Sequence, residues 1–443
     1  MLGEYRIEGR RAAEIAASVE RAVGSGELEP GQLLPPMREL ATRLEVNPNT
    51  VAAAYRTLRE RGVIETAGRR GSRVRSKPVT TARELSRLEV PPGVRNLSDG
   101  NPDPALLPSL VEAFTAAAEI SDRAPGLYGE AAVEPDLARL ARADLDADGV
   151  PDGPVVVTSG SLDAIERVLA AHLRPGDTVA VEDPGWHSVL DLVPALGLRA
   201  VPVGVDPEGP LPDGVRAALD AGARALIVTD RAQNPTGAAL SAARARELRA
   251  VLGKYPQTLL IEDDHGHRIV DLPLCPLAGT TRHWAFTRSA AKAYGPDLRL
   301  AVLTGDAVTM DRVQGRQRLG PGWVSRLLQR AVVRLWSSEA VDTRAVALTY
   351  RRRRDALIGA LAERGIEAYG RSGMNVWVPV PDETGAVARL LHSGWAVAPG
   401  ARFRMSAPPG LRITVSTLGP DEAGAVAEAI AAAVGPAPAR RYV

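Results

Sequence analysis

The stretch LLIEDDH at residues 259–265 places polar side chains directly after an apolar run of strand length. Similar apolar runs recur along the chain at 155–158, 178–181, 225–229 and 300–303. Alanine-rich amphipathic segments and glycine turns separate them. This alternation predicts an α/β fold from residue 96 onward, with a mostly parallel sheet covered by helices. Because the ligands of such sheets bind beyond the carboxyl ends of the strands, we expect the functional site where these runs end.

The composition is that of an ordinary globular protein with several domains. The 443 residues include 54 basic and 53 acidic ones and give a formal net charge of +1, which argues against a general polyanion-coating protein. The single cysteine, Cys275, excludes an intramolecular disulfide and argues against a cysteine-based metal site, so we expect no metal. The N-terminus lacks the apolar core of a secretory signal, and no long uncharged apolar run follows. We therefore expect a cytoplasmic protein.

The N-terminal residues have a different pattern, which indicates three short helices and a hairpin. Apolar residues recur at helical spacing over 12–23, a second helix is expected from Pro36, and Asn47 and Pro48 are suited to cap and open a third. The buried stripe of the third helix would be Val51, Ala54, Tyr55 and Leu58. Two short strands would flank the glycine turn at 67–71. This order predicts a winged helix-turn-helix.

Positive charge is concentrated in this N-terminal part. Residues 1–77 contain 14 basic and 10 acidic residues, although the whole chain has a net charge of only +1. Asn49, Thr50 and Arg56 would point outward from the third helix, where polar groups suit the major groove, and Arg69 and Arg70 would lie at the tip of the wing. The alternative is a small helical bundle with solvated arginines. The agreement of helix spacing, N-cap, wing and charge favours DNA binding.

Short polar motifs follow the apolar runs of the larger part. Gly160, Ser161 and Leu162 follow one run and open a helix, where backbone N–H groups and hydroxyls can bind a phosphate. Trp186 comes just after the next run, and Asp263 ends the run at 259–262. A carboxylate at a strand end often only caps a turn, so each motif is a weak signal by itself.

Lysine is unusually rare in this chain. Only three of the 54 basic residues are lysines, Lys77, Lys254 and Lys292. A primary amine can form a Schiff base, whereas a guanidinium group cannot. Lys77, in a linker, and Lys254, beside a helix end, are expected to be solvated charges. Lys292 is the candidate for amine chemistry.

In their order and spacing, the motifs of the larger part resemble the large domain of fold-type I pyridoxal 5′-phosphate (PLP) aminotransferases, and the resemblance spans about residues 96–430. It rests on residues 99–104, 158–162, 182–187, 233–237, 262–265, 289–299 and 411–414. The resemblance implies that Lys292 holds the cofactor as a Schiff base. Asp263 would bind the protonated pyridine nitrogen, Asn234 the phenolic oxygen, and Trp186 would stack on the ring. The residues at the cofactor phosphate would be Gly160, Ser161, Leu162, Ser289 and Arg299.

Three more roles follow from the same resemblance. Tyr128 resembles the tyrosine that reaches the phosphate of the partner subunit, which implies a homodimer. Arg412 resembles the arginine that binds a substrate α-carboxylate, which implies an amino acid or another small carboxylate as ligand. His265 stands where these proteins usually carry a tyrosine, and its ring can still hydrogen-bond the phenolic oxygen.

The N-terminal motifs resemble the GntR-type winged helix-turn-helix over nearly all of residues 5–75. The match rests on residues 34–41, 46–51, 55–58, 62 and 68–72. It implies a set of residues at the DNA, namely Arg38, Asn49, Thr50, Arg56 and Gly71, with Arg69 and Arg70 beside them in the wing. The partner would be double-stranded DNA.

The two resemblances together are the layout of the MocR subfamily of bacterial transcription regulators. The expected boundaries are 1–76 for the DNA-binding domain, 77–95 for a linker and 96–443 for the aminotransferase-like domain, whose large part spans about 96–330 and whose small α+β part spans about 340–443. The layout implies a regulator that senses PLP, or an amine or amino-acid effector, through the Schiff base on Lys292. Such regulators commonly form head-to-tail, domain-swapped dimers, with no membrane partner.

Two alternatives remain open at this point. In the first, the chain is an active PLP-dependent aminotransferase that acts on an amino acid and carries a tethered DNA-binding domain. In the second, the chain binds DNA and uses a cofactor-free pocket for contacts with other proteins. Keto-acid production from amino acids would indicate the first alternative. The absence of any absorption by a Schiff base would indicate the second.

Overall fold

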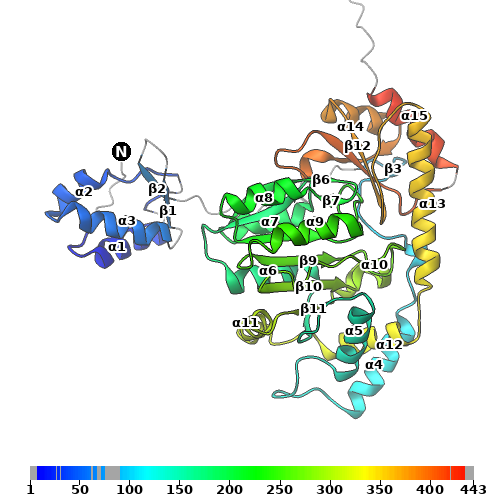
Figure 1. The fold of residues 1–443 in the computed structure, drawn as a ribbon, viewed down its shortest axis with the longest axis horizontal. Coiled ribbons are helices and arrows are strands. Elements are labelled where there is room, and N and C mark those ends of the chain that lie inside the picture. Colours follow the sequence, from blue (N-terminus) through cyan, green and yellow to red (C-terminus); the bar gives the residue numbers. More distant parts are fainter. Residues whose placement is uncertain are drawn as a thin grey trace, which may run out of the picture. The chain divides into compact units, whose positions relative to one another are not determined.

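The computed structural model describes residues 7–25, 27–29, 31–60, 63–66, 71–74, 90–419 and 421–434. The chain divides into two compact units, of which the first consists mainly of residues 1–81. The units are coloured along the sequence in Figure 1. Arg69, Arg70 and most of the expected linker lie outside the described residues, so the predictions made for them stay predictions.

The first unit is a winged helix-turn-helix, as the sequence predicts (Figure 1). Its elements are α1 (Ala12–Ser25), α2 (Met37–Leu44), α3 (Pro48–Glu60), β1 (Ile64–Thr66) and β2 (Ser72–Val74). The side-chain oxygen of Asn47 accepts the N–H of Asn49 at 2.8 Å, so the predicted cap of α3 is present. Val51, Ala54, Tyr55 and Leu58 are all buried, as expected for the inner stripe of α3. The antiparallel pair β1–β2 forms the wing, with Glu65 opposite Arg73.

The second unit is built on an eight-stranded sheet of order β4-β11-β10-β9-β8-β5-β6-β7. The strands are β4 (Val156–Thr158), β5 (Thr178–Asp183), β6 (Arg199–Asp206), β7 (Gly209–Pro210), β8 (Ala225–Thr229), β9 (Leu259–Asp264), β10 (His283–Ser289) and β11 (Ala301–Gly305). Strands β5, β8, β9 and β10 run parallel, whereas β11 is antiparallel to both of its neighbours, β10 and β4. The mostly parallel sheet is therefore confirmed. The stretches of β6 and β10 were not among the apolar runs from which the sheet was predicted.

Helices pack on this sheet and extend the core beyond it (Figure 1). They are α4 (Val111–Arg123), α5 (Pro135–Ala147), α6 (Ser161–His172), α7 (His187–Ala195), α8 (Pro212–Asp220), α9 (Ala242–Leu252), α10 (Ala291–Tyr294), α11 (Ala307–Arg318) and α12 (Arg326–Ser337). Residues of β8 and β9 are buried along their whole length, which explains the apolar run of β8 and of the first half of β9, although β9 ends in three acidic residues. One large core joins the sheet to α4, α5 and α12.

A smaller α+β part completes the second unit. It contains α13 (Thr343–Ala362), β12 (Asn375–Pro379), α14 (Glu383–His392), β13 (Trp395–Ala396), β14 (Ala398–Pro399), β15 (Gly410–Thr414) and α15 (Glu422–Val434). Strands β12, β15 and β14 form an antiparallel sheet with its own core. Strand β3 (Arg95–Asn96), the first strand after the expected linker, pairs in parallel with β13. The start of the second unit is thus attached to its C-terminal part.

Buried charges cross-link β9, β10 and the end of α5. Asp264 is fully buried and accepts hydrogen bonds from Arg231 (2.7 Å) and Arg288 (3.1 Å). Arg288, which is 1% exposed, also donates to Asp144 (3.0 Å) and Asp148 (2.5 Å). Burial opposes the charge of Asp264, but the two arginines lower its pKa to about 2. These paired charges join β9, β10 and the end of α5.

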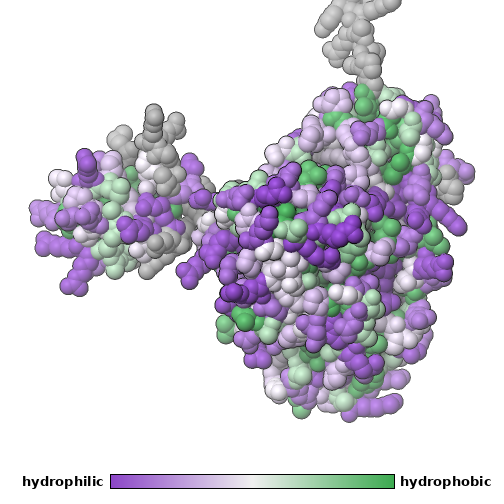
Figure 2. Space-filling view, in the orientation of Figure 1, coloured by the Kyte–Doolittle hydropathy of each residue, from purple (hydrophilic) through white to green (hydrophobic). Residues whose placement is uncertain are grey.

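The surface is that of a molecule with mixed polarity. Figure 2 shows hydrophilic side chains over most of the visible face, with hydrophobic residues scattered between them. Across the described ranges, no helix has both the length and the apolar composition that crossing a membrane would require.

Candidate cofactor site and DNA-binding surface

A cavity of about 370 Å³ lies at the carboxyl ends of β9 and β10 and the start of α6. Its volume is within the usual range for small-molecule sites. The lining residues are Ser161, Leu162, Trp186, Ser188, Asn234, His265, Ser289, Ala291, Lys292, Pro296 and Arg299. Eight of these residues were predicted from the sequence as cofactor-binding. The structure thus brings together residues from motifs that are more than 100 positions apart in the chain.

Lys292 lies on α10, just after β10, and its half-buried side chain lines this cavity. Its Nζ donates a hydrogen bond to the Gly100 carbonyl at 2.7 Å. Burial and the nearby Arg412 lower the pKa of Lys292 to about 8, although Asp263 opposes this shift. The amine is therefore partly neutral near pH 7, as nucleophilic attack on an aldehyde requires.

One end of the cavity is suited to an anion. Ser161 is the first residue of α6, and its buried Oγ has no hydrogen-bond partner among the described residues. Gly160 has a φ of +101°, and a Cβ at this position would lie 2.8 Å from the Arg299 guanidinium. Arg299 donates to the Ser159 carbonyl at 3.1 Å, which holds its cation beside the start of the helix. A helix N-terminus, a free hydroxyl and an arginine together form a phosphate site.

The opposite end of the site contains a buried carboxylate. Asp263 is 2% exposed, and its Oδ1 has no hydrogen-bond partner among the described residues. Asp263 does not line the cavity of about 370 Å³, but it lines a second cavity of about 20 Å³ together with Trp186, which lines both. A buried acceptor without a donor is costly unless a ligand supplies one, and the protonated nitrogen of a pyridine ring is such a donor. The anion site of the cavity and the neighbouring Asp263 therefore fit PLP.

Arg412 and Asn234 are joined by a hydrogen bond. Arg412, on β15, is 2% exposed and donates from Nη1 to the Asn234 Oδ1 at 3.1 Å. A second bond runs from Nη2 to the Ser98 carbonyl. Arg412 is not among the residues that line the cavity, but it is near enough to Lys292 to lower the pKa of that amine. A guanidinium in this place suits the carboxylate of an amino acid, as the resemblance implies.

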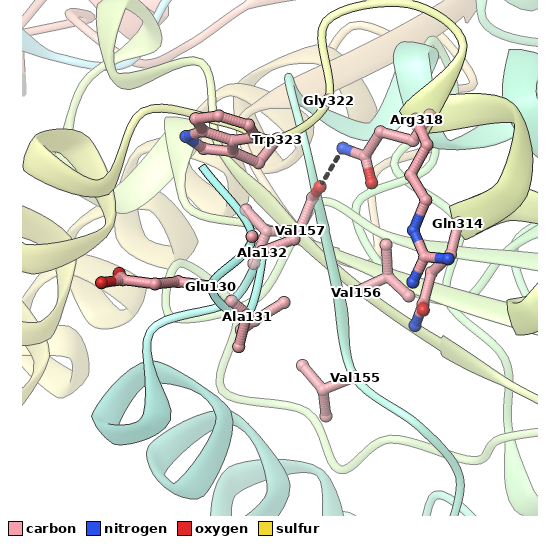
Figure 3. A pocket seen from close by; sticks show the side chains of 13 residues that line it. Glu130, Ala131, Ala132, Val155, Val156, Val157, Gln314, Arg318, Gly322 and Trp323 are labelled. Atoms are coloured by element: carbon pink, nitrogen blue, oxygen red, sulfur yellow. Dashed lines mark hydrogen bonds between the residues drawn. The ribbon is translucent and has the colours of Figure 1, made fainter. Parts of the chain in front are cut away.

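Tyr128 is far more exposed than the other predicted cofactor residues. It is 91% exposed, and its ring meets the edge of Trp323 with centroids 5.5 Å apart. It does not line the cavity of its own chain. Nearby lies a groove of about 700 Å³, whose walls include Trp323 and the edge strand β4 (Figure 3). Gln317, which also lines the groove, donates to the Val157 carbonyl at 2.9 Å.

The predicted DNA-binding residues that the structure describes lie on the surface of the first unit. Arg38, Asn49, Arg56 and Gly71 are exposed, and Thr50 is half-buried. Asn49 and Thr50 occupy the first turn of α3, whose opposite face is buried in the core of the unit. This is the arrangement that a recognition helix needs.

The sequence did not point to all residues of the site. Ser188, Ala291 and Pro296 line the cavity without having been predicted as contacts. Ala291 and Pro296 belong to the motif around Lys292, so their closeness to the lysine in sequence could have indicated that they line the cavity. Ser188 follows Trp186 by two positions, and no residue pattern distinguished it.

Comparison with known proteins agrees with this geometry. Residues 92–430 match the family model of aminotransferase class I and II, and residues 11–74 match that of the gntR family of bacterial regulatory proteins. The chain belongs to the gntR-type regulators that carry an aminotransferase domain. Both resemblances seen in the sequence, and the MocR-type layout that they form, are therefore confirmed.

Two curated relatives of this regulator have related descriptions. PtsJ of Salmonella typhimurium, a vitamin B6 salvage pathway transcriptional repressor, is 44% identical over 95% of this chain and 98% of its own length. PdxR of Corynebacterium glutamicum, a pyridoxine biosynthesis transcriptional regulator, is 32% identical over 60% of this chain and 59% of its own length. Among solved structures, Pyrococcus horikoshii kynurenine aminotransferase superposes with a TM-score of 0.70, covering 80% of this chain and 93% of that one at 20% identity. This last likeness shows the fold.

Proposed function

We propose that this regulator is a cytoplasmic, PLP-dependent DNA-binding protein that changes its affinity for DNA when its second unit binds PLP or an amine or amino-acid effector. The observation that carries the proposal is the Lys292 amine, which has a pKa of about 8 and lines a cavity that also holds an anion site, with the buried Asp263 Oδ1 left without a partner among the described residues. The domain boundaries 1–76, 77–95 and 96–443 are part of the proposal.

Several residues of the site have a defined task in this proposal. When bound, PLP supplies an aldehyde that combines reversibly with amines and a ring that withdraws electrons. Ser161, Ser289 and Arg299 bind the phosphate, with the backbone of Gly160 and Leu162. Lys292 supplies the neutral amine, and Arg412 binds the carboxylate of an effector. Trp186 covers one side of the ring and excludes water.

The names of the relatives support vitamin B6 itself as the signal. PtsJ and PdxR are named for vitamin B6 salvage and for pyridoxine biosynthesis. A regulator whose ligand is PLP reports the supply of that cofactor directly. Repression is the direction supported by PtsJ, the relative that matches over nearly the whole chain.

A homodimer is part of the proposal because Tyr128 is exposed and does not line the cavity of its own chain. Leu127 and Leu319 are 62% and 91% exposed, and Arg326 joins the two segments through an ion pair with Glu130 at 2.8 Å. Large apolar side chains gathered on one exposed surface are typical of interfaces. A second copy that covers this surface would bring Tyr128 to the partner's phosphate site. A head-to-tail, domain-swapped arrangement is proposed, and sedimentation of the full-length chain measures the oligomeric state.

The pKa of Lys292 predicts how fast the protein captures PLP at each pH. A pKa of about 8 leaves roughly one amine in ten neutral at pH 7, against about one in three thousand for a solvated lysine. The second-order rate of PLP capture should therefore rise about tenfold from pH 6 to pH 7 and level off above pH 8. Stopped-flow absorbance checks this profile. A rate that continues to rise up to pH 10 would contradict it.

The exposed arginines of the first unit predict a loss of DNA affinity. Arg38→Ala and Arg56→Ala should each weaken binding by about 1–3 kcal/mol if these side chains contact base edges or phosphates. The measurement is fluorescence anisotropy of full-length protein on a site selected from random-sequence DNA. Arg139→Ala, which removes an exposed arginine of the second unit, is the control and should bind like wild type. Unchanged affinity of both variants would remove these residues from the DNA interface.

The proposal as a whole is tested by measuring DNA affinity with and without PLP. We expect a change of at least about fivefold, the usual lower limit for coupling between two sites. Adding amino acids to the PLP-loaded protein then shows whether an amine shifts the affinity further. Sustained keto-acid production would favour the active aminotransferase instead. If PLP produces neither a visible absorption band nor a change in DNA affinity, the proposal is wrong.

A further inference from the structure

Both ring nitrogens of His265 are already bound by the protein. Nδ1 lies 3.1 Å from the Asp263 Oδ2, and Nε2 lies 2.9 Å from the Ala232 carbonyl oxygen. Neither a carboxylate nor a carbonyl oxygen can donate, so each nitrogen has to supply a hydrogen. A histidine with hydrogens on both nitrogens is an imidazolium. Its charge is balanced by Asp263.

The charged groups around His265 come from three strands. Asp263 lies on β9, Lys292 follows β10, and Glu182 lies at the end of β5. Burial opposes the charge of the ring, but Asp263 raises the pKa of His265 above its usual value, while Lys292 opposes that rise. Burial raises the pKa of Glu182 to about 7, and the charge of His265 opposes this shift. Asp263 is thus the group that keeps the ring protonated.

We propose that His265 is a positioning residue, whose imidazolium holds Asp263 by Oδ2 and leaves Oδ1 for the ring nitrogen of the cofactor, and that it takes no part in binding the phenolic oxygen. The inference rests on the proposed PLP site. It replaces the role that the resemblance implies for His265, because no ring nitrogen is left to face the phenolic oxygen.

The proposal also assigns the phenolic oxygen to Asn234. Its Oδ1 accepts from Arg412, so its amide N–H₂ is the part that remains to donate. Asp263, held by His265, then binds the ring nitrogen of the cofactor. Asn234, held by Arg412, binds the phenolic oxygen. The imidazolium fixes the carboxylate of Asp263 in place because it supplies both a hydrogen bond and an opposite charge.

A double-mutant cycle distinguishes action through Asp263 from direct contact with PLP. The variants are His265→Asn, Asp263→Asn and the double variant, and the readout is the dissociation constant for PLP of the full-length protein. We expect His265→Asn alone to weaken PLP binding about tenfold, a usual size for loss of a charge-assisted hydrogen bond. In the Asp263→Asn background the same change should have less than a twofold effect. Equal effects in both backgrounds would overturn the proposal.

A second measurement uses the protein without PLP. In a protein labelled at the Cε1 of its 6 histidines, the His265 signal is assigned by its loss in His265→Asn. We expect this ring to lose its proton at a pH above the usual range for histidine, and at a lower pH in Asp263→Asn. A ring that loses its proton at or below the usual range, or whose titration is unchanged in Asp263→Asn, would overturn the proposal.

The matched control is His283→Asn, which alters another half-buried histidine that faces an aspartate, Asp306, at 3.3 Å. It should leave PLP binding unchanged because His283 does not line the cavity. If wild-type protein binds no PLP, the proposed function fails, and the titration without PLP still decides whether His265 is a charged partner of Asp263. If wild type binds PLP and the cycle is additive, only the role of His265 fails.

Discussion

Lys292→Ala is expected to abolish the visible absorption band that wild-type protein acquires with PLP. Alanine has no amine, and the other described lysine, Lys254, is exposed at the end of α9 rather than in the cavity. The Ser161 and Arg299 phosphate site remains in the variant, so weak, non-covalent binding of PLP should persist. Absorbance spectra and equilibrium dialysis measure the two effects separately.

The same variant tests whether the covalent bond carries the signal. We expect the DNA affinity of Lys292→Ala to be unaffected by PLP concentrations that saturate wild type. Lys254→Ala is the matched control, because it removes an exposed amine, and it should keep both the band and the response. A band retained in Lys292→Ala would refute the assignment of the Schiff base to this residue.

Arg288→Met should lower the free energy of unfolding of the second unit by about 3–5 kcal/mol. The substitution keeps an unbranched side chain but leaves the buried Asp264, together with Asp144 and Asp148, with fewer cationic partners. Removing one partner from a buried group of charges is costly because the remaining charges stay away from water. Urea denaturation, followed by tryptophan fluorescence, measures the loss.

The control for this prediction is an arginine in an exposed pair. Arg139 and Asp136 are 69% and 71% exposed, so Arg139→Met should change the free energy of unfolding by less than about 1 kcal/mol. If Arg288→Met and Arg139→Met lowered the free energy of unfolding equally, burial would not determine how strongly the Arg288 contacts stabilise the second unit. Because Asp264 has a lowered pKa of about 2, its share of the stability is present at neutral pH and is lost only as the pH falls toward that value.

The apolar runs predicted the central strands because these strands are buried on both faces. Strand β8 (ALIVT) and the first half of β9 (LLI) have no exposed residues, so their sequences are rich in Leu, Ile and Val. The second half of β9 is equally buried but consists of Glu262, Asp263 and Asp264. Strand β10 was not predicted, although it leads directly to Lys292. Its sequence HWAFTRS includes Arg288, which is buried only because acidic residues from two other segments surround it. A pattern of hydrophobicity along the chain contains no information about such partners.

The cavity residues were predicted from ordered motifs, and most of them line one space. The contacts of His265 were not predicted, because the Ala232 carbonyl that binds its Nε2 comes from a segment 33 positions away. A side chain's type indicates what it can bind, whereas the backbone around it decides which of its atoms remain free. The antiparallel course of β11 was missed for a similar reason, since it depends on how the chain returns from α10.

The contacts of Lys292 and Arg412 with residues 98–100 make ligand binding a competition. The Gly100 and Ser98 carbonyls accept hydrogen bonds from the amine and the guanidinium that a ligand would engage. These carbonyls belong to the first residues after β3, near the point where the described part of the second unit begins. A ligand that binds the Lys292 amine or the Arg412 guanidinium therefore breaks one of the hydrogen bonds that hold residues 98–100. If bound DNA pulls residues 98–100 away from the cavity, DNA binding and ligand binding are thermodynamically linked. Each must then change the affinity for the other by the same factor.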